Sequence, residues 1–118
     1  MSPADLLKPG DIVLMDFAPT RGTEQGGTQP ALVVSETSMH EITRRAIVCP
    51  ITRNLQPWPT KVFLPKGLAA DGTVLVDQVR SVDRRQPILR TLGQVPAPVL
   101  DLVRRKLAAL LGIEFAPE

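Results

Sequence analysis

The sequence predicts a mainly β fold with short helices: a single small, twisted β-barrel with a helix at its C-terminal end. Twelve prolines and eight glycines cut the 118 residues into short pieces, which favours strands over a helical bundle. Only the segment from Val99 to Leu111 spaces its apolar residues by three and four, as one face of a helix does. No linker or internal repeat divides the chain, so residues 1–118 are expected to form one domain.

The first half of the chain is expected to contribute three strands and a helical turn. Ile12–Phe17 alternates weakly and is rich in β-forming residues, whereas Ala31–Val34 is a continuous apolar run, typical of a strand buried on both faces. The polar segment from Ser35 to Thr43 predicts a helical turn with its first serine as the cap. Ala46–Cys49 is a third apolar run, which we expect Pro50 to end.

The second half is expected to add further strands and the terminal helix. Strands are predicted at Lys61–Leu64, Thr73–Val76 and Ile88–Gln94, with 77–82 continuing the sheet and turns at Gly67 and Asp71-Gly72. In the helix, Pro98 suits the first turn and Gly112 suits the position just after the end. Asp101 and Arg105 stand four residues apart with the acid first, the favourable order for a helical ion pair. The apolar stripe of this helix is expected to cover an end of the barrel or a partner subunit.

Composition excludes several classes of site. Cys49 is the only cysteine and His40 the only histidine, which excludes an internal disulfide, a cysteine-based zinc site and a two-histidine site within one chain. No apolar run approaches the roughly 20 residues of a membrane span, and the N-terminus lacks the pattern of a signal peptide. We therefore expect a cytoplasmic protein without a metal or other cofactor. Cys49 is interpreted as a small core residue rather than a nucleophile, and His40 as a surface residue.

The charge is modest but unevenly distributed. The net charge is +2 and the isoelectric point is about 9.1. Strands that bring the central arginines together would form a basic surface for phosphates, although from charge alone an ordinary solvated face is the favoured interpretation. Aromatic residues are too few for a broad base-stacking platform. The arginines concerned are Arg44, Arg45, Arg53, Arg80, Arg84, Arg85 and Arg90.

The stretch from Gly10 to Ser35 is the most informative part of the chain. Its two expected strands flank a loop that carries Arg21, Glu24, Gln25 and Gln29 among glycines and threonines. Such a loop cannot bury a core, but it places charges and amides beside rigid strands, where binding and catalytic groups are commonly found. We interpret it as part of a functional site.

The same stretch resembles the MazF/PemK/Kid family, the toxin halves of bacterial toxin–antitoxin pairs. The family pattern Gly-Asp-(apolar)-Asp-Phe-x-Pro-Thr-x-Gly-Ser/Thr-Glu-Gln-x-Gly-x-Arg-Pro-Ala is present, except that Gln29 replaces the arginine before the proline. A second block, Val48–Thr52, resembles apolar-x-Pro-apolar-Thr, and Gln56–Val62 resembles the family's Gly-Tyr-Pro-Phe-x-Val segment. A third block, Val74–Asp83, resembles the family's apolar-Asp-Gln-apolar-Arg/Lys-Ser/Thr-apolar-Asp strands. The blocks cover nearly the whole chain in family order.

This resemblance implies a fold, an activity and partners. The implied fold is an SH3-like barrel of the MazF/Kid/CcdB type. The implied activity is that of a toxin that cleaves single-stranded mRNA at short sequences without a metal. The ribose 2′-hydroxyl attacks the adjoining phosphorus and leaves a 2′,3′-cyclic phosphate and a 5′-hydroxyl. The implied partners are RNA, an acidic MazE-like antitoxin and a second copy of the chain in a symmetric homodimer.

The resemblance also assigns site residues. Thr52, whose hydroxyl can donate to a phosphate oxygen, would otherwise only satisfy a turn after Pro50. Asp77 corresponds to a catalytic aspartate of Kid-type relatives, but Leu75 stands where their arginine does, so catalytic and structural roles are equally open. Trp58 would stack on a base or contact the antitoxin, although a partly buried loop anchor is the favoured interpretation. The resulting catalytic set is Gln29, Thr52, Glu24 and Asp77, and the RNA-binding set is Arg21, Gln25, Arg53, Trp58 and Arg80.

Gln29 leaves the level of activity open. A glutamine keeps a hydrogen-bond donor but lacks the charge of arginine and cannot act as an acid. Loss of one charged transition-state donor lowers the rate roughly 10²- to 10³-fold, so an attenuated nuclease is expected. One alternative is a variant that binds RNA or antitoxin without cleaving. Another is a toxin of the same fold directed at a protein such as gyrase, against which Thr52 and Glu24 argue.

Overall fold

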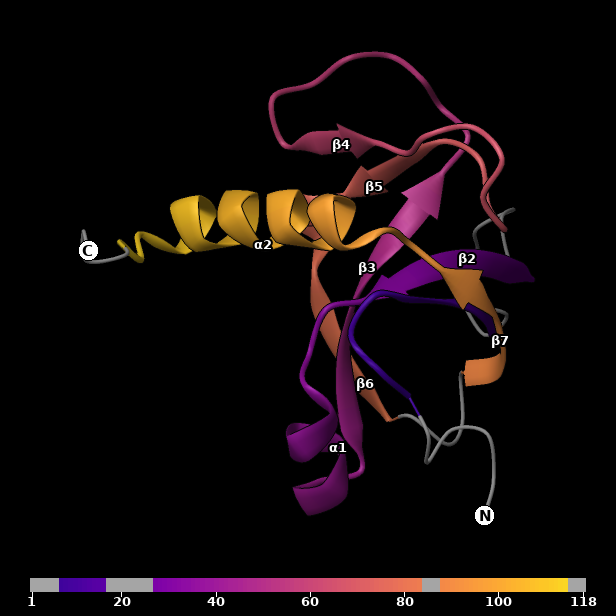
Figure 1. The fold of residues 1–118 in the computed structure, drawn as a ribbon, viewed down its shortest axis with the longest axis vertical. Coiled ribbons are helices and arrows are strands. Elements are labelled where there is room, and N and C mark those ends of the chain that lie inside the picture. Colours follow the sequence, from indigo (N-terminus) through magenta and orange to yellow (C-terminus); the bar gives the residue numbers. More distant parts are fainter. Residues whose placement is uncertain (1–6, 17–26, 84–87, 115–118) are drawn as a thin grey trace.

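The computed structural model describes residues 7–16, 27–83 and 88–114 (Figure 1). Its antiparallel strands and C-terminal helix confirm the predicted fold class. The elements are β1 (Asp11–Asp16), β2 (Thr28–Val33), α1 (Thr37–Ile42), β3 (Arg45–Thr52), β4 (Lys61–Phe63), β5 (Thr73–Leu75), the short 3₁₀ helix η2 (Val76–Gln78), β6 (Arg80–Asp83), β7 (Ile88–Gln94) and α2 (Ala97–Leu111).

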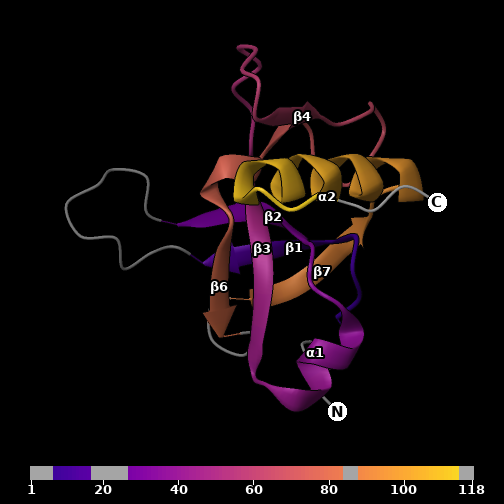
Figure 2. The same cartoon turned by 90° about the vertical axis from the view of Figure 1, so that its left-hand side faces the viewer.

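β3 is the centre of the sheet. The strand order is β4-β5-β3-β2-β1-β7, and β6 also pairs with β3. The first half of β3, up to Val48, pairs with β6, whereas Ile51 and Thr52 at its end pair with β5. Figure 2 shows β3 running from the end of the domain that holds α1 toward the end that holds β4. Within the described residues the sheet is open, with β4 and β7 at its two ends.

Pro50 does not end β3, so that prediction is wrong. The strand continues through Pro50 to Thr52. Pairing with β6 stops at Val48 and pairing with β5 starts at Ile51, so the proline falls where β3 changes partner. A missing backbone N–H interrupts no ladder at such a point.

β2 and β3 are buried on both faces, as the continuous apolar run of β2 predicts. Leu32 and Cys49 lie in the apolar cluster beneath α2, while Val33 and Val48 lie in a second cluster on the other side of the sheet. Cys49 is fully buried, which confirms its interpretation as a core residue. Among residues 7–16, 27–83 and 88–114, none of the helices combines the length and the apolar character that a membrane span requires.

Ser35 and His40 form a buried polar pair, and both predictions for them are wrong. Glu36, not Ser35, is the N-cap of α1, and no side-chain bond caps the helix. The Ser35 hydroxyl lies 2.6 Å from Nε2 of His40 and accepts the backbone N–H of Ile47 at 2.9 Å. Nδ1 of His40 lies 3.2 Å from the carbonyl oxygen of Leu7. His40 is therefore buried because these groups satisfy both of its ring nitrogens.

The segment after β5 turns before it rejoins the sheet. We expected 77–82 to continue the sheet; the part from Arg80 onward does so as β6, whereas Val76–Gln78 forms η2 and interrupts the pairing. The N–H of Val76 donates to the carbonyl of Thr60 at 3.3 Å. Val76 is buried while Asp77 and Gln78 are exposed. The two polar residues inside an apolar run are thereby explained, because they lie on the solvent side of a turn.

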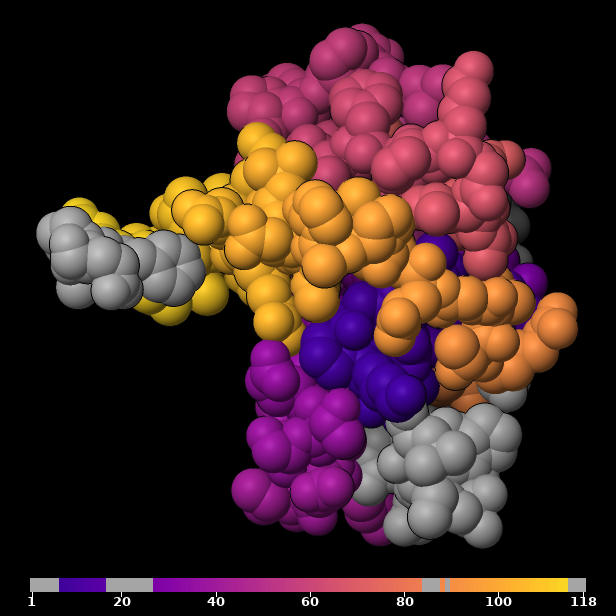
Figure 3. Space-filling view, in the orientation of Figure 1, coloured from indigo at the N-terminus to yellow at the C-terminus, as the bar shows by residue number. Residues whose placement is uncertain are grey.

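α2 begins and ends as its sequence predicts. Pro98 lies in the first turn, and Gly112 ends the helix in the left-handed conformation at φ 75°. Asp101 and Arg105 form the expected ion pair at 2.8 Å. Arg104 fixes the helix to the sheet, since its guanidinium donates to the carbonyl of Val34 at 3.1 and 2.7 Å. The C-terminal end of α2 extends beyond the body of the domain (Figure 3).

Candidate functional site

The pairing of β2 with β3 places Gln29 beside Thr52. Ala31 pairs with Pro50, and the same register continued by two residues sets Gln29 across from Thr52. The Gln29 amide nitrogen Nε2 donates to the carbonyl of Ile51 at 3.0 Å. Two of the predicted catalytic residues therefore lie together at the ends of adjacent strands.

Gln29 and Thr52 line a groove of about 810 Å³. We call it the cleavage groove, after the RNA cleavage that the sequence resemblance implies. Its walls come from the start of β2, the end of β3, the loop before β5 and strand β7. The lining residues are Thr28, Gln29, Pro30, Ile51, Thr52, Arg53, Ala69, Ala70, Asp71 and Leu92. Arg53 is thus the one predicted RNA-binding residue that the described part of the chain brings to this groove.

Thr52 is held in place from two directions. Its hydroxyl oxygen accepts the backbone N–H of Asn54 at 3.2 Å, as the turn interpretation predicted. The same hydroxyl still carries a proton that it can donate to a phosphate oxygen. Thr52 pairs with Thr73 of β5, whose hydroxyl donates to the carbonyl of Asn54 at 3.1 Å. The structural and functional readings of Thr52 are therefore compatible.

Gly72 allows β5 to approach the end of β3. Its φ is +122°, a conformation that side chains rarely adopt. A Cβ atom at this position would lie 2.8 Å from the carbonyl carbon of Thr52 and closer still to its oxygen. From the sequence, Asp71-Gly72 is predicted only to form a turn. The place of Asp71 in the groove depends on the pairing of distant strands, which no local pattern reveals.

The loop between β3 and β4 presents Trp58 to solvent. Trp58 is 63% exposed, so its interpretation as a partly buried loop anchor is wrong. Other groups hold the loop instead. Lys61 Nζ donates to the carbonyl of Gln56 at 2.8 Å, and Lys106 Nζ on α2 donates to the carbonyl of Pro59 at 2.9 Å. Because lysines anchor the backbone, the indole is available for a partner.

Asp77 and Arg80 lie outside the cleavage groove. Asp77 is on the exposed turn η2, and Arg80 pairs with Val48 in the middle of β3. Asp77 is close enough to Cys49 to affect its thiol. Burial, followed by the charge of Asp77, raises the pKa of Cys49 to about 12. The thiol is therefore protonated at neutral pH and is not an activated nucleophile.

The arginines within the described residues are spread along the length of the sheet. Arg45, at the start of β3, donates to the hydroxyl and carbonyl of Ser81, and Arg44 pairs with Asp83 at 3.5 Å. Arg53 follows the other end of this eight-residue strand, roughly 26 Å away at the usual rise per residue. Arg90 is exposed on β7. Arg84 and Arg85 lie outside the described residues.

Three further predicted site residues, Arg21, Glu24 and Gln25, also lie outside the described residues. Within the described ranges, no three His, Cys, Asp or Glu side chains are grouped so that they could hold a metal ion. The site that can be built from the structure therefore consists of Gln29, Thr52 and Arg53, with Asp71 at its edge.

Comparison with known proteins identifies the family. Residues 8–111 match PemK-like, MazF-like toxins of type II toxin–antitoxin systems. The chain belongs to this toxin family. The match covers most of the chain, including every element that contributes to the cleavage groove, so the resemblance seen in the three sequence blocks is confirmed.

Named members of the MazF/PemK family are similar over most of their length. The chain is 35% identical over 103 residues to the endoribonuclease toxin MazF of Escherichia coli K12. The matched segment covers 87% of this chain and 92% of that protein. It is 31% identical over 106 residues to the endoribonuclease PemK of Escherichia coli, covering 86% and 80% respectively. A chain of the MazE–MazF crystal structure from Deinococcus radiodurans has a TM-score of 0.80 and 38% identity, covering 92% of this chain and 98% of that one.

Proposed function

We propose that this MazF/PemK toxin is a metal-independent endoribonuclease that cleaves single-stranded mRNA at short sequences. One observation carries the proposal: the Thr52 hydroxyl, the Gln29 amide and Arg53 line one groove in a chain whose relatives MazF and PemK are named endoribonucleases. The reaction is attack of the ribose 2′-hydroxyl on the adjoining phosphorus, which yields a 2′,3′-cyclic phosphate and a 5′-hydroxyl.

Each groove residue has a defined role in this proposal. Thr52 donates its hydroxyl proton to a phosphate oxygen, and Arg53 supplies the positive charge that stabilises the phosphorane. Gln29 adds a neutral donor, so catalysis is weaker than with an arginine there. Glu24 as the base, and Arg21 and Gln25 as RNA contacts, rest on the family pattern alone.

Asp77, Arg80 and Trp58 act outside the cleavage groove in this proposal. The exposed Trp58 and Arg80 contact RNA or antitoxin beyond the scissile phosphate. Asp77 has a structural role on the turn η2, because it does not line the groove.

The proposed partners follow from the family and from the surface of the chain. A solved relative is a MazE–MazF complex, and the isoelectric point of about 9.1 suits an acidic antitoxin. We place that antitoxin across Arg53 and Trp58. Leu110 and Leu111 are 48% and 63% exposed at the projecting end of α2, which supports a homodimer. The toxin is proposed to act in the cytoplasm as a single domain of residues 1–118.

Cleavage of a mixed-sequence RNA in EDTA tests the proposal. The native chain is expected to cut slowly, and Gln29→Arg is expected to cut about 10²- to 10³-fold faster, because it restores one charged transition-state donor. RNA affinity is expected to change less, since ground-state binding is shared by several cations. Thr52→Ala is expected to lower the rate in both backgrounds.

Gln94→Arg is the matched control for charge. It adds the same group on β7, where the native glutamine donates to Asp11 at 3.0 Å, outside the cleavage groove. If Gln94→Arg accelerates cleavage as much as Gln29→Arg, the effect is general RNA attraction and the proposed role of position 29 is wrong.

A non-catalytic RNA-binding or antitoxin-binding protein is the second candidate function. One observation favours it: the Gln29 amide is already engaged by the carbonyl of Ile51. This candidate predicts RNA binding without cleavage by either the native chain or the Gln29→Arg variant. Product analysis by gel, beside a binding titration on the same RNA, separates the two functions.

A further inference from the structure

A second groove adjoins the cleavage groove. It has a volume of about 530 Å³, within the range of small-molecule sites. Both grooves are lined by Arg53 and Asp71. A strand of RNA whose cleaved phosphate lay at Arg53 would therefore reach this second groove with an adjoining nucleotide. The lining residues are Arg53, Leu55, Phe63, Leu64, Pro65, Lys66, Asp71 and Gly72.

The fold directs Phe63 outward into this second groove. β4 has three residues, and its central residue Val62 points into the core with 3% exposure. Alternation along the strand therefore turns Phe63 to the opposite face, where it is 50% exposed. The Leu64 N–H donates to the carbonyl of Gly72 at 2.9 Å, which closes the loop of residues 65–71 that follows Phe63.

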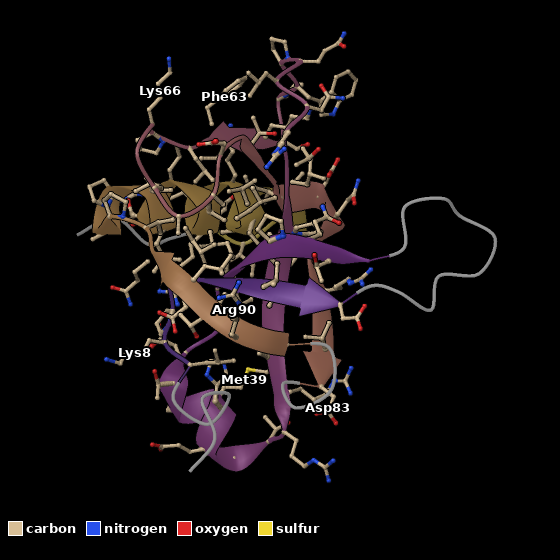
Figure 4. All side chains as sticks on the ribbon, turned by 90° about the vertical axis from the view of Figure 1, so that its right-hand side faces the viewer. Lys8, Met39, Phe63, Lys66, Asp83 and Arg90 are labelled. Atoms are coloured by element: carbon tan, nitrogen blue, oxygen red, sulfur yellow. The ribbon has the colours of Figure 1, made fainter. Side chains whose placement is uncertain are left out.

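The remaining walls combine apolar surface with charge at the edges. Leu55, which is 59% exposed, lines the same groove as Phe63, and Leu64 and Pro65 add to its apolar lining. Lys66 and Arg53 are exposed cations, and Asp71 is an exposed carboxylate. Figure 4 shows Phe63 and Lys66 at the same end of the molecule, opposite the end that holds Met39 and Asp83.

We propose that this second groove binds the nucleobase next to the cleaved phosphate, with the base stacked on Phe63 and its phosphates held by Arg53 and Lys66. The ionised Asp71 carboxylate only accepts hydrogen bonds, so it favours a base that presents a donor at the facing position of its edge over one that presents an acceptor there. The inference rests on the proposed RNA cleavage and extends it to a residue that determines sequence preference. The exposed ring, the two cations and the shared Arg53 favour an RNA strand over an apolar peptide as the occupant.

The test measures binding of short RNAs with 2′-O-methyl riboses, which the proposed reaction cannot cleave. Each RNA carries one abasic nucleotide, moved along the sequence. Base–aromatic stacking contributes about 1–3 kcal/mol, so loss of the correct base is expected to weaken binding to the native chain about 5- to 150-fold. In Phe63→Ala the full RNA is expected to bind weakly by a similar factor, and the same abasic position is expected to have little further effect.

Two further variants sharpen the result. In Lys66→Gln the salt dependence of RNA binding is expected to correspond to the release of about one counterion fewer, because one phosphate contact is lost. Asp71→Asn is expected to change which base is preferred at the abasic-sensitive position. Ile42→Ala is the matched control, since Ile42 is 87% exposed in α1 at the opposite end of the domain. Circular dichroism establishes that each variant is folded.

Specific outcomes overturn the inference. Suppose that the native chain binds RNA, but that the losses of affinity from Phe63→Ala and from the abasic nucleotide add at every position. The second groove then holds no base, and the proposed cleavage is unaffected. If the native chain binds no RNA at all, the proposed function fails and the base site with it. If Phe63→Ala weakens only the binding of an acidic peptide with apolar side chains, the groove is a peptide site.

Discussion

Gly72→Ala is expected to displace Thr52 and so to lower both stability and cleavage. A methyl group at Gly72 would lie 2.8 Å from the carbonyl carbon of Thr52, whereas ordinary contact begins at 3.4 Å. The end of β3 must therefore move by at least 0.6 Å at that carbon, and further at the oxygen. The positive φ adds strain of about 1–3 kcal/mol.

The expected magnitudes follow from these two effects. Unfolding is expected to require about 1–3 kcal/mol less free energy, which lowers Tm by roughly 4 °C per kcal/mol. Displacement of a catalytic group by about 1 Å lowers a rate up to 10²-fold, so cleavage is expected to fall about 10- to 100-fold. The assay is cleavage in the Gln29→Arg background, which is expected to be the more active one, beside thermal unfolding followed by circular dichroism.

Gly67→Ala separates strain from collision. Gly67 also has a positive φ, +91°, but nothing lies within 4 Å of its added methyl group. It is expected to lose stability while keeping most of the cleavage rate. The reasoning is refuted if Gly72→Ala and Gly67→Ala lower cleavage equally, because the collision with Thr52 would then have no consequence at the site.

Three other substitutions or measurements test the interior and the loop. Ser35→Ala removes the hydroxyl that hydrogen-bonds to the N–H of Ile47 and to the ring of His40. The free energy of unfolding measured in urea is therefore expected to fall by about 2–4 kcal/mol. A thiol reagent at pH 8 is expected to label Cys49 only as fast as the protein unfolds. The free energy of unfolding is expected to fall as pH rises from 9 toward 12, because the Cys49 thiol ionises at a lower pH in the unfolded chain than in the folded one. Lys106→Met removes the hydrogen bond to the carbonyl of Pro59. It is expected to change the fluorescence of Trp58 while lowering the free energy of unfolding by less than about 1 kcal/mol.

Each of these has an outcome that contradicts it. An unchanged urea midpoint for Ser35→Ala would mean that the buried pair contributes nothing. Labelling of Cys49 faster than unfolding would mean that the thiol is accessible in the native fold. Identical Trp58 emission in Lys106→Met would mean that α2 does not position the loop.

Local patterns predicted the elements whose signals are complete within a few residues. β7 has the bounds expected from its sequence, and α2 has the expected proline, glycine and ion pair. Long-range partners explain the errors. His40 is buried because Leu7 and Ser35 satisfy its ring, and Pro50 stays in β3 because two different strands pair on either side of it.

The candidate site likewise contains residues that the sequence predicted and residues that it did not. Gln29 and Thr52 were predicted because each lies in a family block, and their proximity follows from the register of β2 and β3. Asp71 and Phe63 were not predicted as site residues. Their positions depend on how β4 and β5 pair and on the approach of Gly72 to β3, and the spacing of residues along the chain does not encode that approach.

The walls of the cleavage groove come from widely separated parts of the chain. Gln29 is at the start of β2, Asp71 precedes β5, and Leu92 is in β7. During synthesis, β2 and β3 can pair early, but they form only one wall while the later strands are absent. The groove is complete only after β7 has been made and has joined β1. The proposed toxicity is therefore withheld from the growing chain and begins when almost all of the domain has folded.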